Sequence, residues 1–159
     1  MADSAPLFWS AVTGHRFGRL RPVAAFVHLN YTRVNHMKHS EGFLKLVNDA
    51  KTRIREVTVD ETRQRMAANN AVRLIDVRED HEWEGGRAAG SIHLAKGIIE
   101  RDIEATVPDK STEVILYCGG GFRSALAADV LQQMGYTNVF SMAGGWKAWQ
   151  DSGAPVEEG

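Results

Sequence analysis

The sequence of 159 residues contains one cysteine, Cys118. A single cysteine excludes an internal disulfide framework and any metal site built from several thiolates, so covalent chemistry at this thiol must be completed by another molecule. Long apolar runs are also missing. The longest one near the N-terminus, Val23–Leu29, is far shorter than the roughly 20 residues of a membrane-spanning helix, and it lacks a signal-peptide cleavage pattern. We therefore predict no membrane anchor, no signal peptide and a cytoplasmic protein.

Charge of one sign is not in excess, because the formal net charge is -1 at pH 7. Lys and Arg are scattered rather than gathered along one helix, so we predict no nucleic-acid-binding face. Residues 1–40 differ from the rest, with five Lys/Arg, four His and one acid, against 14 Lys/Arg and 19 acids in residues 41–159. This shift predicts a weakly ordered N-terminal extension over residues 1–39. It is either a start-site extension upstream of Met37 or a mitochondrial targeting segment.

The apolar pattern predicts an α/β domain over residues 56–153, preceded by a helix in residues 40–55 and followed by a short tail, residues 154–159. Strand and helix patterns alternate, which predicts a central parallel sheet of about five strands with helices on both faces. The predicted strands are 56–59, 72–77, 91–94, 113–117 and 138–142. The predicted helices of the domain are 60–69, 78–83, 98–106, 124–134 and 144–153.

The stretch Ile115–Leu131 places the lone cysteine at the mouth of a glycine-rich turn. Cys118 directly follows an apolar strand, at the sheet edge where open α/β folds bind ligands. Glycines 119–121 permit positive φ and can turn backbone N–H groups inward, and a helix beginning near Ser124 adds its unpaired N–H groups and its dipole. Each of these features favours a thiolate over a thiol. The stretch therefore predicts a nucleophilic cysteine.

The residues from Glu56 to Gly153 resemble a rhodanese-type sulfurtransferase domain. The resemblance rests on Leu74–Arg78 (LIDVR), Glu82-Trp83, Gly90-Ser91-Ile92, the loop Cys118–Ser124 (CGGGFRS) and Gly144–Trp149 (GGWKAW). It implies a single rhodanese-like domain, here with an N-terminal helical extension. Family members often have a histidine and a proline where this chain has Ser91 and His93, and the basic residue that often follows the cysteine in thiosulfate-using members is missing. The sulfur donor is therefore left open.

The resemblance also implies a chemistry for the loop. Cys118 would attack the outer sulfur of a small anionic donor such as thiosulfate and hold that sulfur as a persulfide. An external thiol, a protein acceptor or cyanide would then remove it, and neither a cofactor nor a metal is required. The donor and the persulfide would be bound by the loop amides and rim, residues Gly119, Gly120, Gly121, Phe122, Arg123 and Ser124.

Several roles within this site stay open on the sequence. Arg123 would either hold an anionic donor by charge-assisted hydrogen bonds or brace the loop from beneath. Asp76, at the end of a neighbouring strand, would bond to the loop amides, to Arg123, or simply to Arg78. Phe122 is either a loop anchor or an exposed apolar rim. His93 is either a pocket residue or a structural histidine.

Two other functional classes compete with sulfur transfer. Cysteine-based phosphatases and arsenate reductases share the fold, but they place five residues between the cysteine and the arginine. Here four residues, Gly119–Phe122, separate Cys118 from Arg123, and the narrower loop favours sulfur over a tetrahedral oxyanion. The third class is a non-catalytic sulfur carrier or protein-binding module, which would retain the same residues.

Two further groups of residues are candidates for a function, namely three residues of a predicted acidic helix and two tryptophans. His81, Glu82 and Glu84 crowd one short helix, where we predict a solvated face rather than a metal site. Trp146 and Trp149 lie three residues apart on the last predicted helix, and this spacing predicts packing in the core.

Overall fold

The computed structural model describes residues 39–158. The predictions made for residues 1–38, which include the extension and its apolar run, lie outside the described residues. Among residues 39–158, every helix falls short of the length and apolar character that crossing a membrane would require.

The described chain alternates helices and strands, as the sequence predicts. The strands are β1 (Arg55–Val57), β2 (Arg73–Asp76), β3 (Arg87–Ala88), β4 (Ile92–His93), β5 (Val114–Tyr117), β6 (Val139–Met142) and β7 (Val156–Glu157). The helices are α1 (Glu41–Lys51), α2 (Val59–Ala68), α3 (Asp80–Glu84), α4 (Ile99–Thr106), α5 (Phe122–Gln133) and α6 (Gly145–Asp151).

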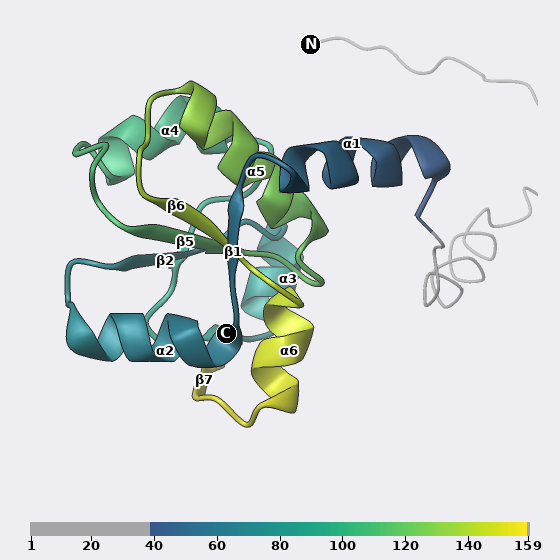
Figure 1. The fold of residues 1–159 in the computed structure, drawn as a ribbon. Coiled ribbons are helices and arrows are strands. Elements are labelled where there is room, and N and C mark those ends of the chain that lie inside the picture. Colours follow the sequence, from purple (N-terminus) through teal and green to yellow (C-terminus); the bar gives the residue numbers. More distant parts are fainter. Residues whose placement is uncertain (1–38, 159) are drawn as a thin grey trace, which may run out of the picture. The chain divides into compact units, whose positions relative to one another are not determined.

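Five strands form one parallel sheet in the order β1-β6-β5-β2-β4. Figure 1 shows α4 and α5 on one face of this sheet and α2 and α6 on the other. The predicted parallel sheet with helices on both faces is therefore confirmed. β5 lies in the centre, between β6 and β2, so the residue that follows it stands at the middle of the sheet edge.

Each face of the sheet has its own apolar core. The face under α4 and α5 buries Ile75, Val77, Leu94, Ile99, Ile103, Val107, Val114, Leu116, Cys118, Ala127, Ala128, Leu131, Tyr136 and Val139. The opposite face buries Val57, Val59, Val72, Leu74, Ala88, Ile115, Tyr117, Phe140, Met142, Trp149 and Ala154. Alternate residues of β5 belong to alternate cores, because successive side chains of a strand point to opposite faces.

Helix α1 packs on α5, outside the sheet (Figure 1). It begins at the predicted N-cap, since the Ser40 side chain accepts a hydrogen bond from the amide of Phe43 at 3.3 Å. Val47 and Ala50 form its buried face. Just after the helix, Arg53 donates two hydrogen bonds of 2.9 Å to the carboxylate of Asp129 in α5.

Several element boundaries differ from the prediction by one or two residues, and one pair of strands was not predicted. Val59 is helical rather than part of the first strand, because Thr58 caps α2 in a capping box with Glu61 and places Val59 in the first turn. β3 and β7 were not predicted, and they pair as a small antiparallel sheet, so part of the predicted tail is a strand. Each has only two residues, too few to show a period.

Candidate functional site

Cys118 lies where β5 ends and is 1% exposed. The amide of Gly121 donates a hydrogen bond of 3.2 Å to Cys118 Sγ, and the hydroxyl of Ser124 lies 3.7 Å from the same sulfur. The sulfur therefore has two hydrogen-bond donors from the predicted loop.

Helix α5 begins two residues earlier than predicted. Gly121 adopts φ 87° as its N-cap, a left-handed conformation that favours glycine, and the chain turns there into the helix. Phe122, Arg123 and Ser124 therefore form the first turn of α5 rather than a loop. The first amides of a helix have no partner within it, so this turn concentrates N–H donors and the positive helix end beside the sulfur.

The loop rests on the first turn of α6. The amides of Trp146 and Lys147 donate to the carbonyl oxygens of Cys118 at 2.7 Å and Gly119 at 3.1 Å. Gly145 has φ 55°, and a Cβ there would overlap the carbonyl oxygen of Cys118. The glycine at this position thus permits the close approach of the two turns. Trp149 is 2% exposed and packs in the core as predicted.

Arg123 is held by Glu82, a residue that the sequence pattern assigned to a solvated face. Two nitrogens of its guanidinium donate to the two carboxylate oxygens of Glu82, at 2.6 and 2.8 Å, and Glu79 lies 3.7 Å away. These hydrogen bonds lower the pKa of Glu82 below its usual value of 4.5 against the opposing effect of burial. Glu82 in turn raises the pKa of Arg123. The prediction for Glu82 was therefore wrong.

Asp76 and Arg78 form a buried ion pair, with side chains 0% and 3% exposed. Arg78 Nε lies 3.0 and 2.9 Å from the two carboxylate oxygens, and a terminal nitrogen of Arg78 donates at 2.6 Å. Arg78 also donates to the carbonyl of Gly86 at 2.7 Å and lies over the ring of Trp146 at 4.8 Å. Burial alone would lower the pKa of Arg78, but Asp76 outweighs burial and raises it.

Of the alternatives left open for Asp76, the structure therefore has the pair with Arg78. In the described part of the chain, its carboxylate accepts no hydrogen bond from the amides of the cysteine loop or from Arg123. Arg78 lies over the ring of Trp146, the residue whose amide donates to the carbonyl oxygen of Cys118.

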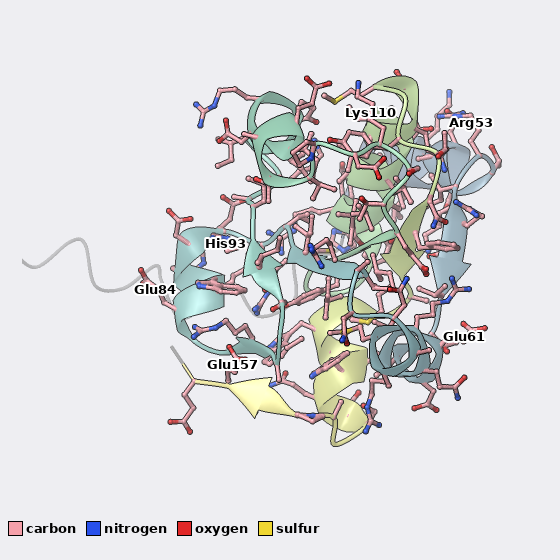
Figure 2. The ribbon with its side chains drawn as sticks, turned by 90° about the vertical axis from the view of Figure 1, so that its left-hand side faces the viewer. Arg53, Glu61, Glu84, His93, Lys110 and Glu157 are labelled. Carbon is pink, nitrogen blue, oxygen red and sulfur yellow. The ribbon has the colours of Figure 1, made fainter. Side chains whose placement is uncertain are left out.

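His93 is a structural histidine. Its Nε2 lies 2.9 Å from the carbonyl oxygen of Arg78, and its ring stacks on Trp83 with centroids 5.0 Å apart. Figure 2 shows His93 on β4 beside α3, and Glu84 on the same helix with its side chain on the outside. Among residues 39–158 there is no group of three or more His, Cys, Asp or Glu side chains that could hold a metal ion.

Phe122 is half-buried and lies against the rings of His39, which precedes α1, and of Phe43 in α1. Its ring centroid lies 4.5 Å from that of His39 and 6.2 Å from that of Phe43. The first turn of α5 is thus anchored on α1, which is the loop-anchor alternative for Phe122.

Residues 58–152 match the family model of the rhodanese-like domain. The chain belongs to this family. The thiosulfate sulfurtransferase GlpE of Actinobacillus succinogenes is 34% identical to it over 102 residues, which are 64% of this chain and 89% of that protein. The thiosulfate sulfurtransferase PspE of Escherichia coli is 37% identical over 73 residues, 46% of this chain and 69% of that protein. Relatives of this rhodanese-like domain are therefore named for sulfur transfer.

A solved structure extends the similarity beyond the matched residues. A Rhodopseudomonas palustris protein of unknown function, described as "Possible Tyrosine Phosphatase", is 28% identical, with a TM-score of 0.65 over 77% of this chain and 98% of that one. The family match of this rhodanese-like domain contains both Cys118 and α6, whereas α1 precedes it. The anchor between α1 and Phe122 is consequently an addition to the matched domain.

Proposed function

We propose that this protein is a sulfurtransferase in which Cys118 carries the transferred sulfur as a persulfide. The observation that carries the proposal is the setting of Cys118 Sγ, which accepts the amide of Gly121 at 3.2 Å beside the first turn of α5. A terminal persulfide sulfur is an anion, and several N–H donors at a helix start stabilise an anion. Family membership and the names of the relatives support the same chemistry.

The proposed first step transfers one sulfur atom. The thiolate of Cys118 attacks the outer sulfur of thiosulfate, a new S–S bond forms, and the old S–S bond breaks as sulfite leaves with its electron pair. In the second step an acceptor thiolate or cyanide attacks the outer sulfur of the persulfide. The acceptor becomes a persulfide or thiocyanate, and the thiolate of Cys118 is regenerated. No proton transfer is needed when the nucleophiles are already ionised.

Arg123 has two roles in this proposal. Its bidentate pair with Glu82 fixes the guanidinium beside the loop. A guanidinium has five N–H donors, so the N–H groups not directed at Glu82 can bind an anionic donor. Because Glu82 offsets the charge of Arg123, we expect thiosulfate to bind more weakly than it would to an unpaired arginine.

The proposal is tested by mass spectrometry of the intact protein after incubation with thiosulfate. We expect a gain of the mass of one sulfur atom, lost on addition of cyanide with formation of thiocyanate. Cys118→Ser should show neither the adduct nor thiocyanate. The chain has no other cysteine, so an adduct in the wild type can be assigned to Cys118 directly. Absence of the adduct with thiosulfate and with organic persulfides would contradict the proposal.

A phosphatase is the second candidate, because the Rhodopseudomonas palustris protein of unknown function is described as "Possible Tyrosine Phosphatase". The same preparations should therefore be assayed for hydrolysis of p-nitrophenyl phosphate. We expect no hydrolysis that depends on Cys118, since the loop is one residue shorter than the phosphatase spacing. Hydrolysis lost in Cys118→Ser, without a sulfur adduct, would replace our proposal with this one.

A further inference from the structure

Ser141 is a polar side chain in the middle of an apolar strand. Its neighbours in β6, Val139, Phe140 and Met142, are all buried, and Ser141 itself is 0% exposed. A buried hydroxyl is costly unless it is hydrogen-bonded. In the part of the chain that the structure describes, the Ser141 side chain has one hydrogen bond, to Ser124 Oγ at 2.9 Å.

The sheet register places Ser141 on the face that carries the cysteine. Ser141 is paired with Leu116 of β5, and residues paired across two strands point to the same face of a sheet. Leu116 and Cys118, two residues apart, belong to the same core. Ser124, in the first turn of α5, lies over this face with its hydroxyl 3.7 Å from Cys118 Sγ. The two buried hydroxyls of Ser141 and Ser124 therefore form a chain of hydrogen bonds that ends at the sulfur of Cys118.

The direction of this chain follows from the number of protons. A serine hydroxyl has one proton and two lone pairs. When Ser124 donates its proton to Cys118 Sγ, its oxygen has to accept the bond from Ser141, so Ser141 is the donor. Donation to Ser124 polarises that hydroxyl and strengthens its hydrogen bond to an anionic sulfur.

We propose that Ser141 is a positioning residue for the nucleophile, acting through Ser124. It holds the Ser124 hydroxyl with its proton toward Cys118 Sγ and so favours the thiolate. The inference rests on the proposed function for its purpose, but its physical content, a larger thiolate fraction at neutral pH, can be measured without any sulfur donor.

The test compares Ser141→Thr with Ser141→Val, two side chains of nearly equal shape that differ in the hydroxyl. The thiolate of Cys118 is followed by its ultraviolet absorbance against pH, with the matching Cys118→Ser protein subtracted as background. We expect the midpoint of this titration to be about half a unit higher in the valine variant, a roughly threefold loss of thiolate, which is typical of one lost hydrogen bond. Ser124→Ala should raise the midpoint by about one unit, because it removes the direct bond to a charged group.

A double variant distinguishes positioning from a general packing effect. Because Ser141 acts through Ser124, Ser124→Ala combined with Ser141→Val should titrate like Ser124→Ala alone. The charged groups near the loop, Arg123 with Glu82 and Glu79 and the buried pair Asp76–Arg78, are unchanged in every variant. Equal midpoints for the threonine and valine variants, or additive shifts in the double variant, would overturn the inference.

Two controls keep the result clear. Thr62→Val removes another buried hydroxyl, which donates to the carbonyl of Thr58 at 2.8 Å in α2, and it should leave the titration of Cys118 unchanged. Ser141→Ala replaces the valine variant if that protein does not fold. If the Ser141 variants shift the titration while the wild type gains no sulfur from any donor, the proposed function fails and the positioning role stands. Sulfur transfer with no shift in the titration would overturn the positioning role and leave the proposed function in place.

Discussion

Glu82 and Arg123 are 41 positions apart in the chain, yet their hydrogen bonds link α3 to the first turn of α5. Both side chains are about one-third exposed or less, so water screens their interaction only in part. The bidentate geometry fixes the plane of the guanidinium. A single carboxylate thereby sets both the position and the effective charge of the arginine beside Cys118.

We predict that Glu82→Gln lowers the free energy of unfolding by about 1–2 kcal/mol at pH 7, which is the value of hydrogen bonds to charged groups reduced by partial screening in water. The pKa of Glu82 is lower in the folded state than its usual 4.5, so its stabilisation is present above about pH 4.5 and is lost as the pH falls through the folded pKa. Urea unfolding at several pH values should therefore show that the free energies of unfolding of wild type and Glu82→Gln approach each other in acid.

The matched control for this prediction is Glu84→Gln. Glu84 is exposed on the same short helix, and surface substitutions of this kind change stability by less than about 0.5 kcal/mol. If the difference in stability between wild type and Glu82→Gln did not shrink as the pH was lowered below about 4.5, the ion pair would not be its cause.

At the scale of elements, two helix starts meet at the loop. α5 begins beside the sulfur at Gly121, and α6 begins beneath it at Gly144, both glycines with positive φ. The first amides of α6 donate to the carbonyl oxygens of the loop, and the amide of Gly121 donates to Cys118 Sγ. One turn therefore supports the backbone of Cys118, while the other supplies donors to its side chain.

Replacing Gly145 by alanine should destabilise the protein and displace this loop. The residue has φ 55° and no room for a Cβ beside Cys118, so we expect a loss of about 3 kcal/mol or more from strain and overlap. Persulfide formation should fall more than the folded fraction, as measured by mass spectrometry of the folded protein. Gly42→Ala is the control, because nothing lies within 4 Å of a Cβ there and alanine favours a helix. Equal effects of the two substitutions would contradict this explanation.

At the scale of the whole molecule, the Asp76–Arg78 ion pair connects the sheet to the parts of the chain that pack on it. Arg78 links the end of β2 to the turn at Gly86 and to the Trp146 ring of α6. Both charges are almost completely buried, so each depends on the other for compensation.

Asp76→Asn should therefore cost about 3–5 kcal/mol, because it leaves the guanidinium of Arg78 buried without its counter-charge. Chemical denaturation of the variant and of Glu56→Gln gives the comparison. Glu56 pairs with Lys51 on the surface, with side chains 32% and 34% exposed, and its loss should cost less than about 1 kcal/mol. Similar losses of unfolding free energy in the two variants would contradict the view that burial makes the Asp76–Arg78 pair more stabilising than a surface pair.

Local pattern was sufficient for most of the fold. The capping box at Thr58 and the apolar run of β5 depend on neighbours in sequence, so helix and strand positions were predicted to within a few residues. The start of α5 was placed two residues too late, because Gly121 opens the helix with a positive φ, a conformation that a glycine permits but does not require. The strands β3 and β7 were not predicted, because a two-residue strand has no sequence pattern of its own and exists only through its hydrogen bonds to the other strand.

The candidate site divides in the same way. The placement of the thiol, at a strand end before glycines and a helix, could be predicted from adjacent residues, because backbone geometry over a short stretch depends on local sterics. The partners of that stretch could not be predicted. Glu82, the partner of Arg123, and Ser141, the partner of Ser124, come from other elements, 41 and 17 positions away. Such side-chain contacts exist only once the sheet order and the helix packing bring the elements together.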